Sequence, residues 1–131
     1  MLQTKVNSLE FDSLQLEETH LNSAKKVLYL ISFFPFIYKR HPFCYTMFYA
    51  NETYVLLTKE LKAGSKECLS IHSLKKNGRD ITLEWDYCAT KTGKTVKVRN
   101  KTFTYDLIKL NHAPVRGFNV DAKRVPVSNE R

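Results

Sequence analysis

The sequence predicts an α+β fold: one N-terminal helix packed on a five- to six-strand antiparallel meander, followed by an irregular basic C-terminal tail. Apolar residues recur at helical spacing before Pro35, and alternating segments separated by turn residues follow from Phe43 onward. The 131 residues are 43% hydrophobic and 26% charged, which is typical of an ordinary globular chain. We therefore expect a single α+β domain over residues 1–110 and an irregular or partly disordered tail over residues 111–131.

The helix is expected over about residues 13 to 33, where apolar side chains share one face. Pro35 ends it, because proline lacks the amide hydrogen that a continuing helix needs. A shorter helix that begins at Ala24, with Ser23 as its N-cap, is the alternative. In both cases the apolar face is expected to cover one side of the sheet.

Hairpin turns define the predicted sheet. The first turn joins residues 43–49 to residues 53–61, and another lies at Asn77-Gly78, a pair that favours a two-residue turn. The last part of the meander is expected to turn at Lys91-Thr92 and again at Asn100-Lys101. Both of these registers place the same alternate residues on one face. That face, which the helix is expected to cover, consists of Ile81, Leu83, Trp85, Tyr87, Val96, Val98, Phe103, Tyr105 and Leu107.

The opposite face of the predicted sheet is charged. The registers place Glu84 across from Arg99 and Asp86 across from Lys97. Lys97 and Arg99 are therefore predicted to be ion-pair partners of these carboxylates rather than ligands of phosphate.

The excess positive charge lies in the last third of the chain. Residues 1–60 carry six cations and six acids, residues 61–88 five and four, and residues 89–131 ten and three. A basic end is typical of a protein that contacts a polyanion. We therefore predict a small non-enzymatic binding protein that contacts nucleic-acid phosphates through one end of the sheet and the tail. The residues expected to make these contacts are Lys91, Lys94, Lys109, Arg116, Lys123 and Arg124.

The segment FFPFIYKRHPF, residues 33–43, predicts a second function. Its apolar density exceeds what one helix end normally buries, and cations interrupt it. Either it packs as the crossover from helix to sheet, or it forms an exposed apolar patch with a cationic rim, which marks a surface for a protein partner or for self-association. The alternative function is thus an adaptor or accessory factor that uses this segment or a sheet edge. The expected partner-binding residues are Phe33, Phe34, Phe36, Tyr38 and Arg40.

Catalytic patterns are weak in this sequence. It contains no phosphate-cradling glycine loop and no nucleophile elbow, so we expect no enzymatic activity and no cofactor. A minor alternative is a metal-dependent nuclease in which Glu84 and Asp86 hold a divalent cation. Zinc-ligand residue types occur without the close spacing of structural zinc sites, so no metal site is assigned, and the sequence leaves the question open. These residues are His41, Cys44, Cys68 and His72.

Cysteine content and hydropathy predict the compartment. Three cysteines are an odd number, and the N-terminal residues lack a basic start followed by an apolar core. We therefore expect an intracellular, cytoplasmic protein in a reducing compartment. The apolar stretch at residues 27–38 has about 12 residues, whereas a membrane-spanning helix needs about 20, so no membrane span is expected.

Overall fold

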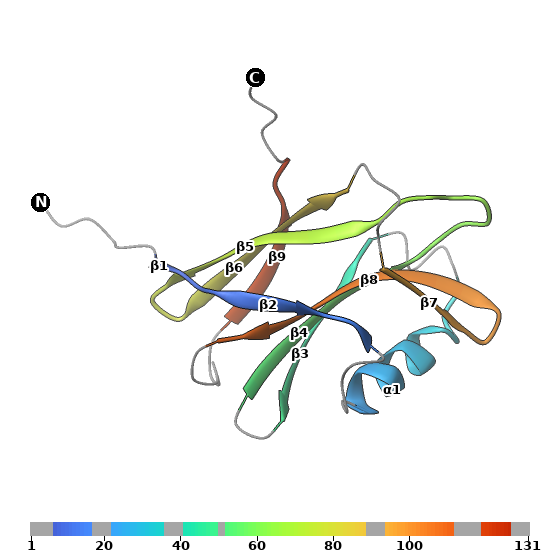
Figure 1. The fold of residues 1–131 in the computed structure, drawn as a ribbon, viewed down its shortest axis with the longest axis horizontal. Coiled ribbons are helices and arrows are strands. Elements are labelled where there is room, and N and C mark those ends of the chain that lie inside the picture. The colour runs from blue at the N-terminus through green and yellow to red at the C-terminus, as the bar shows by residue number, and fades with distance from the viewer. Residues whose placement is uncertain are drawn as a thin grey trace, which may run out of the picture.

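The structure is a computed structural model that describes residues 7–16, 22–35, 41–49, 52–88, 94–111 and 119–126. These residues form one helix and two β-sheets (Figure 1). In chain order the elements are β1 (Asn7–Ser8), β2 (Phe11–Leu14), α1 (Asn22–Ile31), β3 (Phe43–Tyr49), β4 (Glu52–Glu60), β5 (Leu69–Asn77), β6 (Asp80–Tyr87), β7 (Lys94–Val98), β8 (Lys101–Leu110) and β9 (Asn119–Arg124).

The two sheets stack on each other, and α1 lies below the hairpin of β7 and β8 (Figure 1). The four-stranded sheet has the order β1-β5-β6-β9, and the five-stranded sheet has the order β2-β8-β4-β3, with β7 beside β8. All pairs are antiparallel except β6 with β9. The α+β class with one helix and mostly antiparallel sheet is thus confirmed, whereas a single meander of five to six strands matches the strands only roughly.

The five-stranded sheet is the middle layer, and both of its faces are buried at its central strands, β4 and β8. This explains why β4 and β8 are buried along almost their whole length. The core between the two sheets consists of Val55, Leu57, Leu69, Ile71, Leu74, Ile81, Leu83, Trp85, Ile108 and Leu110. The core between the five-stranded sheet and α1 consists of Leu16, Ala24, Leu28, Ile31, Met47, Tyr54, Leu56, Phe103, Tyr105 and Leu107.

The helix is shorter than the longer prediction. Residues 11–14 form β2 against β8, so a helix that begins near residue 13 is wrong, and α1 is close to the shorter alternative. Phe11 packs in the core between the sheets, whereas Leu14 packs in the core under the helix. Apolar residues with opposite orientations suit the two-residue period of a strand, and the sheet pairing outweighs the weak helical pattern.

Three of the predicted hairpins form. β3 pairs with β4, and β5 pairs with β6, but the turn between β5 and β6 lies at Gly78-Arg79, one residue later than the predicted Asn77-Gly78, and Gly78 has a φ of +64°. β7 pairs with β8, but the turn lies at Arg99-Asn100, both with positive φ, one residue earlier than predicted. This shift places Val96 opposite Phe103 instead of Tyr105. Phe103 and Tyr105 lie on the same face of β8, so each side chain of the hairpin keeps its predicted face.

The predicted hairpin between β6 and β7 does not form. β6 pairs with β5 and β9, whereas β7 pairs with β8 in the other sheet. The face predicted to lie under the helix is therefore divided between two cores: Trp85 packs between the sheets, and Val98 packs in the core under α1. Alternation shows which side chains share a face of a strand, but it does not tell which sheet the strand joins.

The predicted ion pairs change for the same reason. Glu84 pairs with Lys75 at 3.4 Å, and Asp86 pairs with Arg124 at 2.9 Å. Lys97 and Arg99, which were expected to face these carboxylates, lie on the other sheet at and beside the turn after β7.

Part of the predicted tail belongs to the four-stranded sheet. Residues 119–124 form β9, parallel to β6, where the sequence predicts a loop or tail. Val120 and Ala122 pack against the core between the sheets. Two apolar residues in an otherwise polar segment are a weak strand signal, and the open edge of β6 supplies the hydrogen bonds that make it a strand.

A disulfide joins Cys68 and Cys88, which lie opposite each other where β5 begins and β6 ends, with their Cα atoms 5.3 Å apart. Disulfides persist mainly in oxidising environments, so the predicted reducing compartment does not clearly fit the structure. The helical part of the described chain is too short and too polar to cross a membrane.

Candidate binding surface at the helix and hairpin end

The cations that the sequence assigns to nucleic acid lie on different sheets. Lys94 and Lys109 are on β7 and β8 of the five-stranded sheet, whereas Lys123 and Arg124 are on β9 at the edge of the other sheet. The structure therefore does not gather these four side chains at one sheet end. Those that fall outside the described residues are Lys91 and Arg116.

Three of these four cations have carboxylate partners within the chain, which reduces the positive charge they offer to a phosphate. Lys123 is exposed on β9. Ion pairs at a protein surface contribute at most about 1 kcal/mol, so a strong polyanion can compete for Lys109 and Arg124, the more exposed of the three paired cations. The pairs are Lys94–Asp106 at 3.8 Å, Lys109–Glu52 at 3.4 Å and Arg124–Asp86 at 2.9 Å.

Three of the residues considered for metal binding, Glu84, Cys68 and His72, have other partners. Glu84 accepts a hydrogen bond from the Ser73 hydroxyl at 2.7 Å, and Cys68 is bound in the disulfide. His72 Nε2 lies 2.9 Å from the carbonyl oxygen of Val125. Within the described ranges, no group of three or more His, Cys, Asp and Glu side chains converges to hold a metal ion.

A polar cluster that sequence patterns do not reveal surrounds the buried Asp106. β2 pairs with β8 as far as Leu107, and β7 pairs with it as far as Tyr105, so Asp106 lies where the two strands meet along one edge of β8. Its Oδ2 accepts the amide hydrogen of Ile71 at 2.7 Å, next to a β-bulge in β5. Ser13 donates its hydroxyl to Oδ1 at 3.2 Å. The carboxylate thus joins the two sheets.

The same cluster contains a lysine beside a serine, an arrangement that some hydrolases use. Burial raises the pKa of Asp106, and the hydrogen bond from Ile71 and the charge of Lys94 oppose this only in part. Lys94 Nζ donates to the Ser13 hydroxyl and to the Leu14 carbonyl, and it faces Asp106. Two of the three ammonium hydrogens are thus donated, and the Asp106 carboxylate lies 3.8 Å away as an ion-pair partner. These contacts tie Lys94 to β2 and β8.

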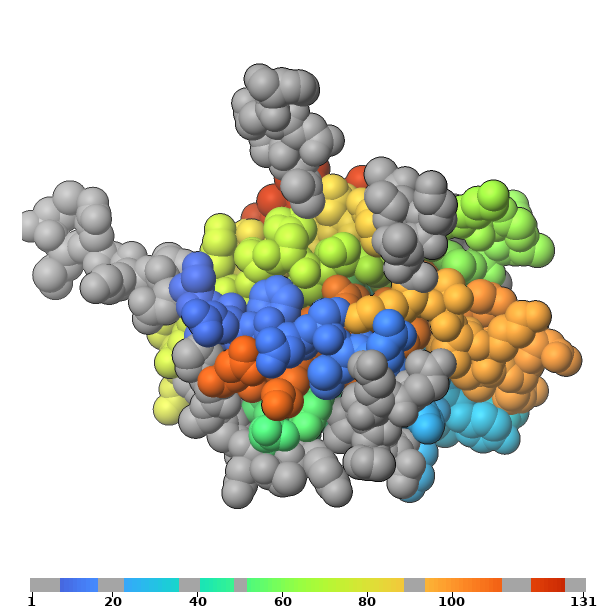
Figure 2. Space-filling view, in the orientation of Figure 1, coloured from blue at the N-terminus to red at the C-terminus, as the bar shows by residue number. Residues whose placement is uncertain are grey.

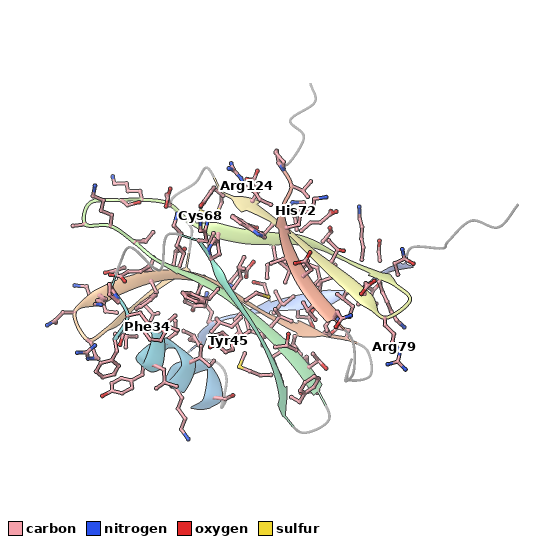
Figure 3. All side chains as sticks on the ribbon, turned by 180° about the vertical axis from the view of Figure 1, so that it is seen from behind. Phe34, Tyr45, Cys68, His72, Arg79 and Arg124 are labelled. Carbon is pink, nitrogen blue, oxygen red and sulfur yellow. A yellow bond between two sulfur atoms is a disulfide. The ribbon has the colours of Figure 1, made fainter. Side chains whose placement is uncertain are left out.

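Large apolar side chains are exposed where α1 ends. Figure 3 shows Phe34 at the end of the molecule formed by α1 and the β7–β8 hairpin, far from Arg79 at the opposite end. Phe33 and Phe34 belong to the predicted partner-binding residues, and the other predicted residues, Phe36, Tyr38 and Arg40, fall outside the described ones. We name the exposed group the aromatic ridge: Tyr29 at 50% exposed, Leu30 at 62%, Phe33 at 53% and Phe34 at 49%.

The hairpin turn holds the aromatic ridge in place. The Arg99 guanidinium lies 3.7 Å from the centre of the Phe33 ring and donates to the Ser32 carbonyl at 3.2 Å. Lys101 Nζ donates to the Phe34 carbonyl at 3.2 Å. The last carbonyls of a helix lack partners within the helix, so these two cations satisfy part of that need. The ridge is therefore a built surface and not a frayed helix end.

The described segments that form the aromatic ridge and the hairpin beside it carry only positive charge. Residues 22–35 and 94–105 contain six cations and no Asp or Glu. Lys94 is engaged with Asp106, so five cations surround the ridge. Tyr29 and Leu30 lie off the buried face of α1, which is the signal by which their exposure could have been predicted. The five cations are Lys25, Lys26, Lys97, Arg99 and Lys101.

Comparison of the chain with known protein families, with curated proteins and with solved structures finds no match. Any functional argument therefore depends on the chain's own residues.

Proposed function

We propose that this chain is a non-enzymatic binding protein that attaches to an anionic lipid surface through the aromatic ridge and its five cations. The observation that carries the proposal is that four large apolar side chains stay about half exposed in segments that contain no carboxylate. Apolar side chains that enter the boundary between headgroups and acyl chains, flanked by lysine and arginine, are what an interfacial contact requires.

The expected strength of the contact follows from its parts. Each cation near an anionic bilayer contributes about 1 kcal/mol, so five contribute at most about 5 kcal/mol. This alone corresponds to a dissociation constant of a few hundred micromolar. Phe33 and Phe34 are half exposed, and burying the remainder contributes about 1 kcal/mol for each ring. Attachment therefore needs both the charges and the apolar side chains.

Other partners fit this surface less well. Bases of single-stranded nucleic acid stack on free aromatic faces, whereas Arg99 already covers one face of Phe33 and the edge of Tyr29 approaches the same ring at 5.1 Å between centroids. A second copy of the chain would bring cations against cations. If the chain is an adaptor, an acidic protein could pair with the five cations. The experiment below distinguishes such a protein from a lipid surface.

Nucleic-acid binding through the predicted basic residues remains a second candidate. The net charge of +8 and the exposed Lys123 support it. The two candidates use different residues, so variants of the aromatic ridge separate them.

The test is sedimentation with vesicles of phosphatidylcholine alone and of phosphatidylcholine with about 30% phosphatidylserine, across a salt series. We expect binding to the anionic vesicles that weakens with salt, since surface charges are screened. Phe33→Ser with Phe34→Ser is expected to lower the affinity roughly thirtyfold, from about 2 kcal/mol of lost burial. The matched control is Tyr45→Ser with Phe48→Ser, which changes two exposed aromatic residues on β3 and should leave binding unchanged.

Three outcomes would overturn the proposal. One is no binding to anionic vesicles at low salt, and another is an equal loss in both double variants. The third is retention of polyglutamate or of single-stranded RNA by the wild type without retention of vesicles, which would favour an acidic protein or a nucleic acid as the partner.

A further inference from the structure

A pocket opens between α1 and the β7–β8 hairpin, beside the aromatic ridge. Its volume is about 530 Å³, within the range of small-molecule sites. In Figure 2 the helix lies directly beneath the hairpin at the edge of the molecule, so the two walls of the pocket come from segments far apart in the sequence. The described residues that line it are Leu16, Lys25, Lys26, Leu28, Tyr29, Thr95, Val96, Lys97, Val98 and Tyr105.

The inner walls of the pocket are apolar. Leu28 and Tyr105 belong to the core under the helix, and Val96 and Val98 pack against that core. The Tyr105 hydroxyl accepts the amide hydrogen of Leu16 at 3.0 Å, so the tyrosine offers its ring to the pocket while its polar atom is already engaged. Such a site binds hydrocarbon and provides little for a polar group to pair with.

The charged groups of the pocket are lysines. Lys25 and Lys26 are exposed on α1, and Lys97 is exposed on β7, across the opening. No carboxylate lines the pocket among the described residues. An apolar interior with a cationic rim suits a ligand that has an apolar body and an anionic head, and it disfavours an amine head.

We propose that this pocket binds a single acyl chain that ends in a carboxylate or phosphate, with the chain between α1 and the hairpin and the head on Lys25, Lys26 and Lys97. The inference builds on the proposed function, since both take the partner to be an anionic lipid. Tyr29 belongs both to the aromatic ridge and to the pocket wall, so a chain that leaves a lipid surface at the ridge reaches the pocket directly.

Calorimetric titration with monomeric fatty acids tests the inference without any lipid surface. The probes are the saturated carboxylates from octanoate to tetradecanoate, each below its aggregation concentration. Burial of one methylene favours binding about fourfold, so affinity should rise by roughly that factor per added methylene and level off when the pocket is full. Dodecylammonium, with the same chain and the opposite charge, should bind at least tenfold more weakly than dodecanoate.

Two variants localise the binding. Val96→Trp fills the pocket with an indole and should abolish binding; circular dichroism checks that it folds. Lys25→Glu with Lys97→Glu changes exposed residues only, so the fold is retained, and dodecanoate should bind at least tenfold more weakly. Lys66→Glu with Arg79→Glu is the matched control on exposed positions elsewhere and should bind as the wild type does.

The inference is overturned if folded wild type binds no dodecanoate at about millimolar concentration, if dodecylammonium binds equally well, or if the rim and control variants lose binding alike. Vesicle attachment without fatty-acid binding would refute acyl-chain binding in the pocket and leave the proposed function intact. Fatty-acid binding without vesicle attachment would refute the proposed function and leave acyl-chain binding intact.

Discussion

Replacement of Asp106 by alanine tests whether this carboxylate joins the two sheets. Its Oδ2 accepts the amide hydrogen of Ile71 at 2.7 Å, and the residue is 7% exposed. The substitution leaves that amide without its acceptor at the bulge of β5, which costs about 1–3 kcal/mol. The lost carboxyl group also leaves a small void. We therefore expect the free energy of unfolding to fall by about 2–3 kcal/mol.

Asp106→Asn is the matched control for this prediction. Its amide oxygen can still accept the Ile71 hydrogen, and loss of the negative charge costs little because burial already raises the pKa of Asp106. Urea denaturation at pH 7 should place this variant within about 1 kcal/mol of the wild type, since the Ile71 amide keeps its acceptor and the raised pKa means that folding disfavours the charged carboxylate relative to a neutral group. Equal losses in the two variants, or a loss below about 0.5 kcal/mol for alanine, as at an ordinary surface site, would refute the reasoning.

Three further predictions concern the cysteines and the pH dependence of stability. Reduction of the Cys68–Cys88 disulfide, with a sequence separation of 20, should lower the free energy of unfolding by about 3 kcal/mol in urea titrations with and without reductant; an unchanged midpoint would contradict this. Burial raises the pKa of Cys44 to about 11, so little of its thiol is ionised at pH 8 in the native chain. Iodoacetamide should therefore modify Cys44 roughly a hundredfold more slowly in the native chain than in the denatured chain. Equal rates would be incompatible with its burial. The raised pKa of Asp106 means that the folded state binds this proton more tightly than the unfolded state. The wild type should therefore lose stability relative to Asp106→Asn as pH rises from about 4 through the folded pKa. A difference in unfolding free energy that stays constant over this pH range would show that the pKa of Asp106 does not change on folding.

Local patterns were sufficient to predict three hairpins, but not the exact position of each turn. The β5–β6 hairpin forms as expected, but its turn lies at Gly78-Arg79, one residue later than predicted, because Gly78 takes the first turn position, where glycine adopts positive φ without strain. The β7–β8 hairpin has its predicted faces, although its turn is formed by Arg99 and Asn100 rather than by Asn100 and Lys101. Two consecutive non-glycine residues with positive φ give little sequence signal, so the turn could be located only to within one residue.

The binding surface was predictable only in part. The apolar density after residue 32 pointed to Phe33 and Phe34, which are exposed. The pocket was not predictable, because its walls are α1 and a hairpin more than 60 residues later in the sequence. The cluster of Asp106, Ser13 and Lys94 is likewise assembled from three strands, and no spacing in the sequence links them.

By itself, the sequence determined which side chains of a strand share a face, the presence of a hairpin close to Gly78, the helix before Pro35 and the excess of positive charge. These properties depend on the alternation of a strand and on the preferences of neighbouring residues, which act over a few positions. Only the tertiary structure decided that β6 and β7 join different sheets and that β9 completes the four-stranded sheet beside β6. It also decided that the five cations come together with the aromatic ridge. Strands of either sheet have the same local pattern, and their partners are selected by the burial of whole faces between layers.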